Sequence, residues 1–345
     1  MFKKGGIGKS RSETKVSHLK ETKKISTQGV DLPGLSPDPK EWGQGTWFAI
    51  IADALLSRTE ETIKEFIKRR IPVLVNLLCI TCSEHSYIFI QKRHPNKYLV
   101  VLDSRGENLG MYNWIVDLKN DVNNRLERPN YPREEVDKLF RPLLELTTEE
   151  IMANRESAMS VETMPHLISL DWSQKPRLAS KLSQLNPNPD AWGKGVWALL
   201  FMDALRSRTK TAIIEFIKRV IPIVVNLLDE KSSTRAYDLI TKRHPLKYVE
   251  IYDWREENIG MYVWLIDLKN DINAILGKPH YPKSRVDSMW LPLLELSKDD
   301  IESDREAAMT VETMANIVYL EYFPEDESSQ EEVKEVKPCA TCGSH

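Results

Sequence analysis

The chain has 345 residues, 41% of them hydrophobic and 29% charged, and its formal net charge is −3. A chain of this length and balance can bury two ordinary hydrophobic cores, and it has no overall positive charge that would attract nucleic acid. It contains no run of about 18 uncharged apolar residues, and its N-terminus lacks the apolar core of a secretory signal. The sequence therefore predicts a soluble, unsecreted protein with no transmembrane segment and no nucleic-acid partner.

Residues 1–35 are predicted to form a disordered basic arm. The first 24 residues hold eight Lys or Arg against two Glu, with Gly and Ser between them. Such a composition cannot bury enough apolar surface to fold alone. A solvated tail is the simplest interpretation, and contact with a membrane surface or a polyanion is the alternative.

The chain repeats itself after 150 residues without an insertion, so that Trp47 falls on Trp197. A repeat of this length predicts two similar domains, at residues 36–172 and 186–323. The linker between them, residues 173–185, contains a proline and several Lys, Arg and Ser residues and reads as a solvated connection. We expect the two domains to pack as an intramolecular pseudo-dimer, and two independent domains are the alternative.

Apolar residues recur at steps of three and four within each copy, a spacing that predicts amphipathic helices and an all-α fold. One stripe runs from Met111 to Leu126 and a second from Ile63 to Leu74, and both recur in the second copy. About five or six helices per copy are expected from such stripes. Residues 98–103 are the best strand candidate, but they are short and isolated.

Several helix boundaries can be predicted from residues with positional preferences, each matched 150 residues later. Thr59 is suited to cap the second helix of the first copy. Pro72 lies within that helix and implies a kink or a restart at the first turn of a new helix. The third helix ends at His94, because the residue before a proline resists the α conformation. A short final helix begins at residues 147–150, which have the pattern of a capping box.

All four cysteines lie in two CxxC pairs, and chance rarely places so few cysteines this way. Cys79 and Cys82 lie in the first copy, whereas Cys339 and Cys342 lie in an acidic, polar segment, residues 324–345, that is predicted to be a flexible tail. A CxxC pair can close a disulfide with little backbone movement. A helix start at Cys82 would also favour its thiolate. We therefore interpret the pairs as sites of dithiol/disulfide exchange.

A zinc site is the alternative chemistry for these cysteines. Each pair is followed at the same spacing by a histidine, His85 or His345, and two such segments can together supply four ligands. The second pair lies on the predicted tail, whereas structural zinc usually organises the segment that binds it. A zinc-binding scaffold is therefore the lesser alternative, and no residue is assigned as a metal ligand.

Aromatic and polar residues around the first cysteine pair follow a more specific pattern. They are Gly43, Trp47, Trp114-x4-Lys119-Asn120-x-Val122-Asn123 and Arg128-Pro129-x-Tyr131. This pattern resembles the Erv/ALR family of FAD-linked sulfhydryl oxidases, and the second copy fits its last block through Asn270, Asn273 and Gly277-Lys278. The resemblance covers most of both copies. It implies two tandem Erv/ALR-like bundles, each a four-helix bundle with short extra helices.

The same resemblance implies a thiol oxidase that holds FAD in the first bundle and passes electrons from thiols to molecular oxygen. Cys82 would be the sulfur next to the flavin and Cys79 the one attacked by a thiol-containing protein substrate. Cys339 and Cys342 would form a shuttle that exchanges disulfides with this pair. The residues implied to bind the cofactor are Gly43, Trp47, Trp114, Lys119, Asn120, Val122, Asn123, Arg128 and Tyr131.

Departures from the family pattern lead to a hypothesis of a different class. Where the family has two histidines, the first copy has Ile51 and Lys119, and the second has Phe201 and Lys269. A lysine can attract a pyrophosphate but cannot stack as an imidazole does. The motif asparagines, three apart on one helical face, can equally form hydrogen bonds between buried helices. The chain would then be a non-catalytic structural or virion-assembly protein with assembly partners, and either hypothesis predicts a cytoplasmic or virion location.

Overall fold

The computed structural model describes residues 43–76, 80–168, 170, 189–227 and 230–320. In this part of the chain there are fourteen α-helices and several short 3₁₀-helices, and the only β-type pairing is two isolated bridges. The predicted all-α fold is confirmed. The predicted arm, linker and tail, residues 1–35, 173–185 and 324–345, lie outside the described residues.

The described helices form two matching sets. The first set is α1 (Gly43–Leu55), α2 (Glu60–Leu74), α3 (Ile80–Lys92), η2 (Pro95–Tyr98), α4 (Gly110–Arg125), α5 (Arg133–Leu139), α6 (Arg141–Leu144), α7 (Thr148–Ser157) and η3 (Met164–His166). The second is α8 (Pro189–Leu205), α9 (Lys210–Leu227), α10 (Glu230–Lys242), η5 (Pro245–Tyr248), α11 (Gly260–Ile275), α12 (Lys283–Met289), α13 (Leu291–Glu295), α14 (Lys298–Ala307) and η6 (Met314–Asn316). Each described set has seven α-helices rather than five or six, because the chain breaks at Phe140 and Trp290 into two short helices.

The predicted helix boundaries agree with the structure at the capped ends. Thr59 caps α2 and forms a capping box with Thr62, and Thr147 does the same for α7 with Glu150. Helix α3 ends at Lys92, just before the His94–Pro95 turn. Local side-chain chemistry therefore sets these ends, as the sequence indicates.

The restart predicted at Pro72 is wrong. Helix α2 continues to Leu74, and α9 continues from Pro222 to Leu227. Proline removes one backbone hydrogen bond. However, the neighbouring side chains Ile71 and Leu74 are fully buried, and this packing holds the segment helical.

Each repeat buries aromatic rings between its long helices. Trp114 of α4 meets Phe66 of α2 edge-on with 6.4 Å between ring centroids, and Trp264 and Phe216 repeat this contact at 6.2 Å. The indole N–H of Trp114 donates to the carbonyl oxygen of Arg93 at 2.8 Å. The core thus ties α4 both to α2 and to the end of α3.

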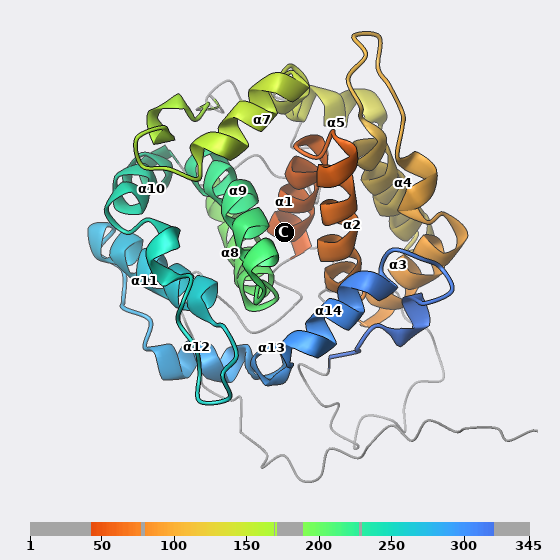
Figure 1. Cartoon of the computed structure of the whole chain (residues 1–345). Coiled ribbons are helices and arrows are strands. Elements are labelled where there is room, and N and C mark those ends of the chain that lie inside the picture. Colours follow the sequence, from red (N-terminus) through yellow and green to blue (C-terminus); the bar gives the residue numbers. More distant parts are fainter. Residues whose placement is uncertain (1–42, 77–79, 169, 171–188, 228–229, 321–345) are drawn as a thin grey trace, which may run out of the picture.

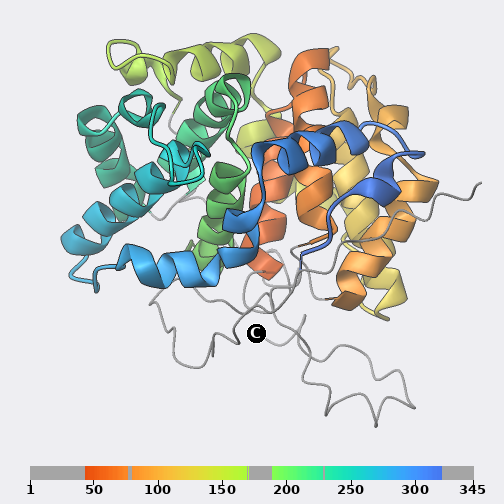
Figure 2. The same ribbon diagram turned by 60° about the horizontal axis from the view of Figure 1, so that its bottom comes forward.

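The two repeats are interlocked rather than merely adjacent. Helices α1 and α8 lie side by side at the centre, α7 packs on α9 of the other repeat, and α14 packs on α2 (Figures 1 and 2). Beyond these crossing helices, the side chain of Asn226 accepts a hydrogen bond from the backbone N–H of Leu170, and Asn76 accepts one from Leu320. The C-terminal segment of each repeat therefore completes the other repeat.

Candidate functional site

Three of the residues implied to bind a cofactor form one buried cluster. The Nζ atom of Lys119 on α4 lies 4.9 Å from the centroid of the Trp47 ring and 5.6 Å from that of Tyr131. An ammonium group over aromatic faces is a favourable cation–π arrangement. Lys119 is 2% exposed and Trp47 4% exposed, so the two side chains fill this space themselves.

The motif asparagines hold the segment that follows α4. Asn120 pairs with the backbone of Tyr131, donating to its carbonyl oxygen at 3.1 Å and accepting from its N–H at 2.7 Å. Asn123 donates to the carbonyl oxygen of Pro129 at 3.1 Å. Their hydrogen bonds therefore run from helix to loop, and not from helix to helix as the structural interpretation of the sequence supposed.

The other residues predicted to bind the cofactor lie apart from the cluster around Lys119, or take part in the fold through a backbone hydrogen bond. Trp114 packs with Phe66 and Phe89. Val122 is buried on α4, and the backbone N–H of Arg128 donates to the carbonyl oxygen of Asn123. Gly43 begins α1, where a Cβ atom would meet none of the described residues within 4 Å. The structure thus gathers some of the set around Lys119 and leaves the rest in ordinary packing roles.

The second repeat contains the same cluster. Lys269 Nζ lies 4.7 Å from the centroid of the Trp197 ring and 5.9 Å from that of Tyr281, and Asn270 pairs with the Tyr281 backbone. A bound flavin would need accessible side-chain surface and free polar atoms. The buried lysine and tryptophan offer almost no surface, and the Asn120 amide is already occupied in the fold. The side chains around Lys119 thus leave little room for FAD, whereas the Oδ1 atom of Asn123 is buried without a hydrogen-bond partner among the described residues. FAD binding stays a hypothesis.

The cysteine chemistry falls largely outside the described residues. The structure does not describe Cys79, Cys339 or Cys342. Cys82 lies in the first turn of α3, but its side chain is not described. Among the residues that are described, no group of three or more His, Cys, Asp or Glu side chains is placed to hold a metal ion. The predicted redox pair and the zinc alternative both remain hypotheses.

Sequence reasoning missed a buried ionic cluster between the repeats, which we call the axis cluster: Asp53, Arg69, Arg70, Asp203 and Arg219. Arg69 Nη1 donates to Asp203 Oδ1 at 2.6 Å, and Arg219 Nη1 donates to Asp53 Oδ1 at 2.7 Å. Arg70 joins both carboxylates, at 2.6 Å to Asp53 and 3.0 Å to Asp203. All five side chains are almost completely buried. A pseudo-twofold axis between α1 and α8 therefore passes through charged groups.

Electrostatics keeps the carboxylates of the axis cluster ionised. Burial would raise the pKa of Asp53 and of Asp203, but the arginines around them outweigh burial and hold both pKa values below their usual range. For Arg70, burial acts to lower the pKa, and attraction to the two carboxylates overcomes it. The sequence signal for this cluster was Asp53, a charged residue within the apolar run of α1. A charged side chain is rarely buried unless it is paired, so Asp53 indicated a buried partner of opposite charge.

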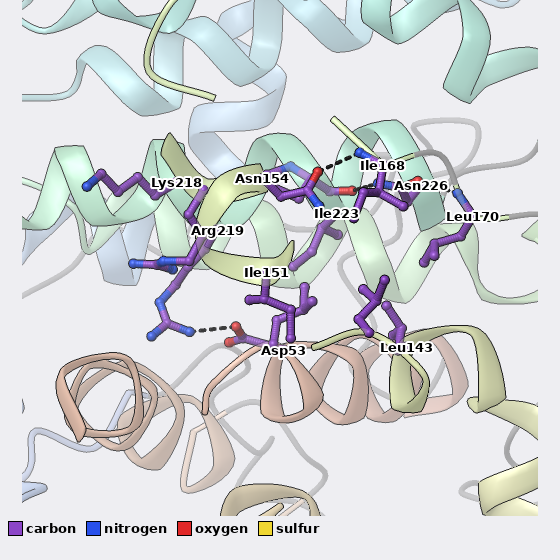
Figure 3. A pocket seen from close by; sticks show the side chains of 14 residues that line it. Asp53, Leu143, Ile151, Asn154, Ile168, Leu170, Lys218, Arg219, Ile223 and Asn226 are labelled. Carbon is purple, nitrogen blue, oxygen red and sulfur yellow. Dashed lines mark hydrogen bonds and ion pairs between the residues drawn. The ribbon is translucent and has the colours of Figure 1, made fainter. Parts of the chain in front are cut away.

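A pocket also lies between the repeats, lined by α1, α6 and α7 on one side and α9 on the other (Figure 3). The residues implied to bind a cofactor are all described, and none of them lines it. Leu56 and Asn154 belong to its lining, and their counterparts in the other repeat, Arg206 and Asp304, form a buried ion pair. The repeats have thus diverged at this place.

Two buried histidines join the repeats. His94 Nε2 lies 3.1 Å from the carbonyl oxygen of Ala308, and its Nδ1 accepts from the N–H of Asn96. His244 makes the matching bond to Ala158. Because Nδ1 accepts, the ring is neutral and Nε2 is the donor. These histidines therefore serve the interface between the repeats.

We expect the protein to lose stability in mild acid through these histidines. Burial lowers the pKa of His94 and of His244. As the pH falls below about 6.5, the unfolded chain takes up protons first, so the free energy of unfolding falls. Unfolding midpoints measured between about pH 5 and pH 8 should show this loss, and a His94→Gln/His244→Gln variant should show a smaller one. Equal slopes for both proteins would contradict the assignment.

These features define the class of the protein: an all-α chain of two interlocked helical repeats around a buried ionic axis. No family model, no curated protein and no solved structure matches it. None of the helices that the structure describes is both long and apolar enough to cross a membrane.

Proposed function

We propose that the chain is a non-catalytic structural protein, an interlocked scaffold of two Erv/ALR-like bundles that acts in the cytoplasm or in a virion. The observation that carries this proposal is the buried cluster of Trp47, Lys119 and Tyr131, whose Tyr131 backbone is held by Asn120. The repeat without cysteines builds the same cluster from Trp197, Lys269 and Asn270. An arrangement shared by both repeats supports a role in folding rather than in redox chemistry.

Two projecting hairpin loops support a role in binding an assembly partner. They precede α4 and α11 and extend from the body at opposite ends in Figure 1. In the second loop Trp254 is 90% exposed, whereas its counterpart in the first loop is Ser104. Arg255 braces this loop by bonds to Asp253 and to the carbonyl oxygen of Glu295 at 3.1 Å. An exposed tryptophan on a braced loop is typical of a protein-binding surface.

A thiol oxidase is the second candidate, and the position of Cys82 favours it. The residue lies in the first turn of α3, where aligned peptide dipoles stabilise a thiolate. In this case a thiol-containing protein would exchange disulfides with Cys339 and Cys342, and these with Cys79 and Cys82, while molecular oxygen would be the final acceptor. Against this candidate, the buried side chains of Lys119 and Trp47 fill the space in which the flavin would have to bind.

Visible absorption and oxygen uptake of the purified full chain test the two candidates. We expect a colourless protein that stays colourless after incubation with FAD and removal of the excess, and that consumes no oxygen with a dithiol. Bound flavin that a dithiol bleaches and air restores would overturn the structural proposal, provided that a Cys79→Ser/Cys82→Ser variant loses the activity. Zinc analysis of the same sample tests the zinc-binding alternative.

A further inference from the structure

Arg70 has no counterpart in the axis cluster. The other members form symmetric pairs 150 residues apart, Asp53 with Asp203 and Arg69 with Arg219, but position 220 is a valine. Arg70 bonds both aspartates and therefore lies on the pseudo-twofold axis. Val220 is fully buried, so an arginine at this position would also have to be accommodated inside the protein.

Pairing of two like repeats would unbalance this axis. Two copies of the first repeat would bring two Arg70 and two Arg69 side chains to two Asp53 carboxylates, with no water to screen them. Such an excess of buried positive charge is strongly destabilising. Two copies of the second repeat would keep one Arg219 for each Asp203, but the two carboxylates would face each other with no guanidinium joining them. Only a pair of unlike repeats places one guanidinium group, that of Arg70, between the two aspartate carboxylates.

We infer that the axis is a single-occupancy guanidinium site that makes the pairing of the repeats heterotypic. The first repeat supplies the bridging arginine and the second supplies the small side chain opposite it. The partner surface of α1 and α2 is therefore the α8 and α9 face of an unlike repeat, in the same chain or in a second copy that exchanges repeats. This inference does not depend on the proposed function.

Moving the arginine across the axis tests the inference in the full chain. Arg70→Val leaves the two carboxylates without their bridge, and Val220→Arg adds a second guanidinium, so each variant should lower the unfolding midpoint by about 5–10 °C. The double variant Arg70→Val/Val220→Arg restores one bridging arginine. Its midpoint should recover most of the way to that of the unchanged protein.

A matched control separates charge from side-chain size. Arg70→Val/Val220→Met fills the same space with a flexible uncharged chain, and we expect no such recovery from it. The inference is supported if Val220→Arg rescues Arg70→Val and Val220→Met does not, even where a single variant fails to fold. The inference is overturned if the loss of stability in Arg70→Val/Val220→Arg equals the sum of the losses in the two single variants. It is also overturned if Val220→Met rescues Arg70→Val as well as Val220→Arg does.

Discussion

Replacing Asp53 with Asn is expected to destabilise the protein by about 3–5 kcal/mol, the usual cost of removing one partner from a buried ion pair. The change leaves Arg70 and Arg219 buried, with a neutral amide where they contact the carboxylate at 2.6 and 2.7 Å. Desolvated guanidinium groups cannot regain this interaction from water. Denaturant unfolding of the variant and of the unchanged protein measures the difference.

Asp203→Asn is the internal replicate of this experiment, because Asp203 accepts from Arg69 and Arg70 as Asp53 accepts from Arg219 and Arg70. The two single variants should lose similar amounts. Asp121→Asn is the control, since Asp121 pairs with Arg125 across one helical turn at a half-exposed site. Such a pair contributes about 0.5 kcal/mol or less. A loss at Asp53 as small as that at Asp121 would contradict the importance of the axis cluster.

The helices could be predicted from sequence because their signals are local. Thr59 and Thr147 cap helices within three residues of themselves, and the repeat offset brings each element back at a known position. The restart at Pro72, one of the two outcomes predicted there, fails for the opposite reason. The effect of this proline on the helix depends on the burial of Ile71 and Leu74 against other helices, and a local rule does not contain that packing.

The axis cluster could not be predicted because its bonds join distant residues. Arg69 and Arg219 bond aspartates more than 130 residues away, and α7 and α14 likewise cross to the other repeat. Sequence spacing shows that Asp53 lies in an apolar helix but not which arginine reaches it. Motif spacing brought Trp47 and Lys119 to attention as ligand-binding residues. Their burial and the contact of Lys119 with the Trp47 ring are visible only in the folded chain.

A second large effect is expected at Gly110, where α4 begins. An alanine Cβ there would lie 1.7 Å from the carbonyl oxygen of Tyr98, far inside any contact distance. The obstructing atom belongs to the backbone and cannot move aside as a side chain could. The Asn108 side chain also fixes this backbone, because it donates to the carbonyl oxygen of Leu99 at 2.6 Å and accepts from the N–H of Gly110 at 3.0 Å. Helix α4 would have to shift as a unit, so Gly110→Ala should cost more than about 3 kcal/mol or prevent folding.

The matched control for this change is Gly43→Ala, which also places alanine in the first turn of a helix. In the part of the chain that the structure describes, a Cβ there meets nothing within 4 Å. Alanine favours a helix by up to about 1 kcal/mol over glycine, so stability should stay the same or rise slightly. Gly260→Ala should repeat the loss, because its Cβ would lie 1.7 Å from Tyr248 O. If Gly110→Ala and Gly43→Ala unfolded alike in thermal denaturation, the close approach of α4 to η2 would not be a constraint on the fold.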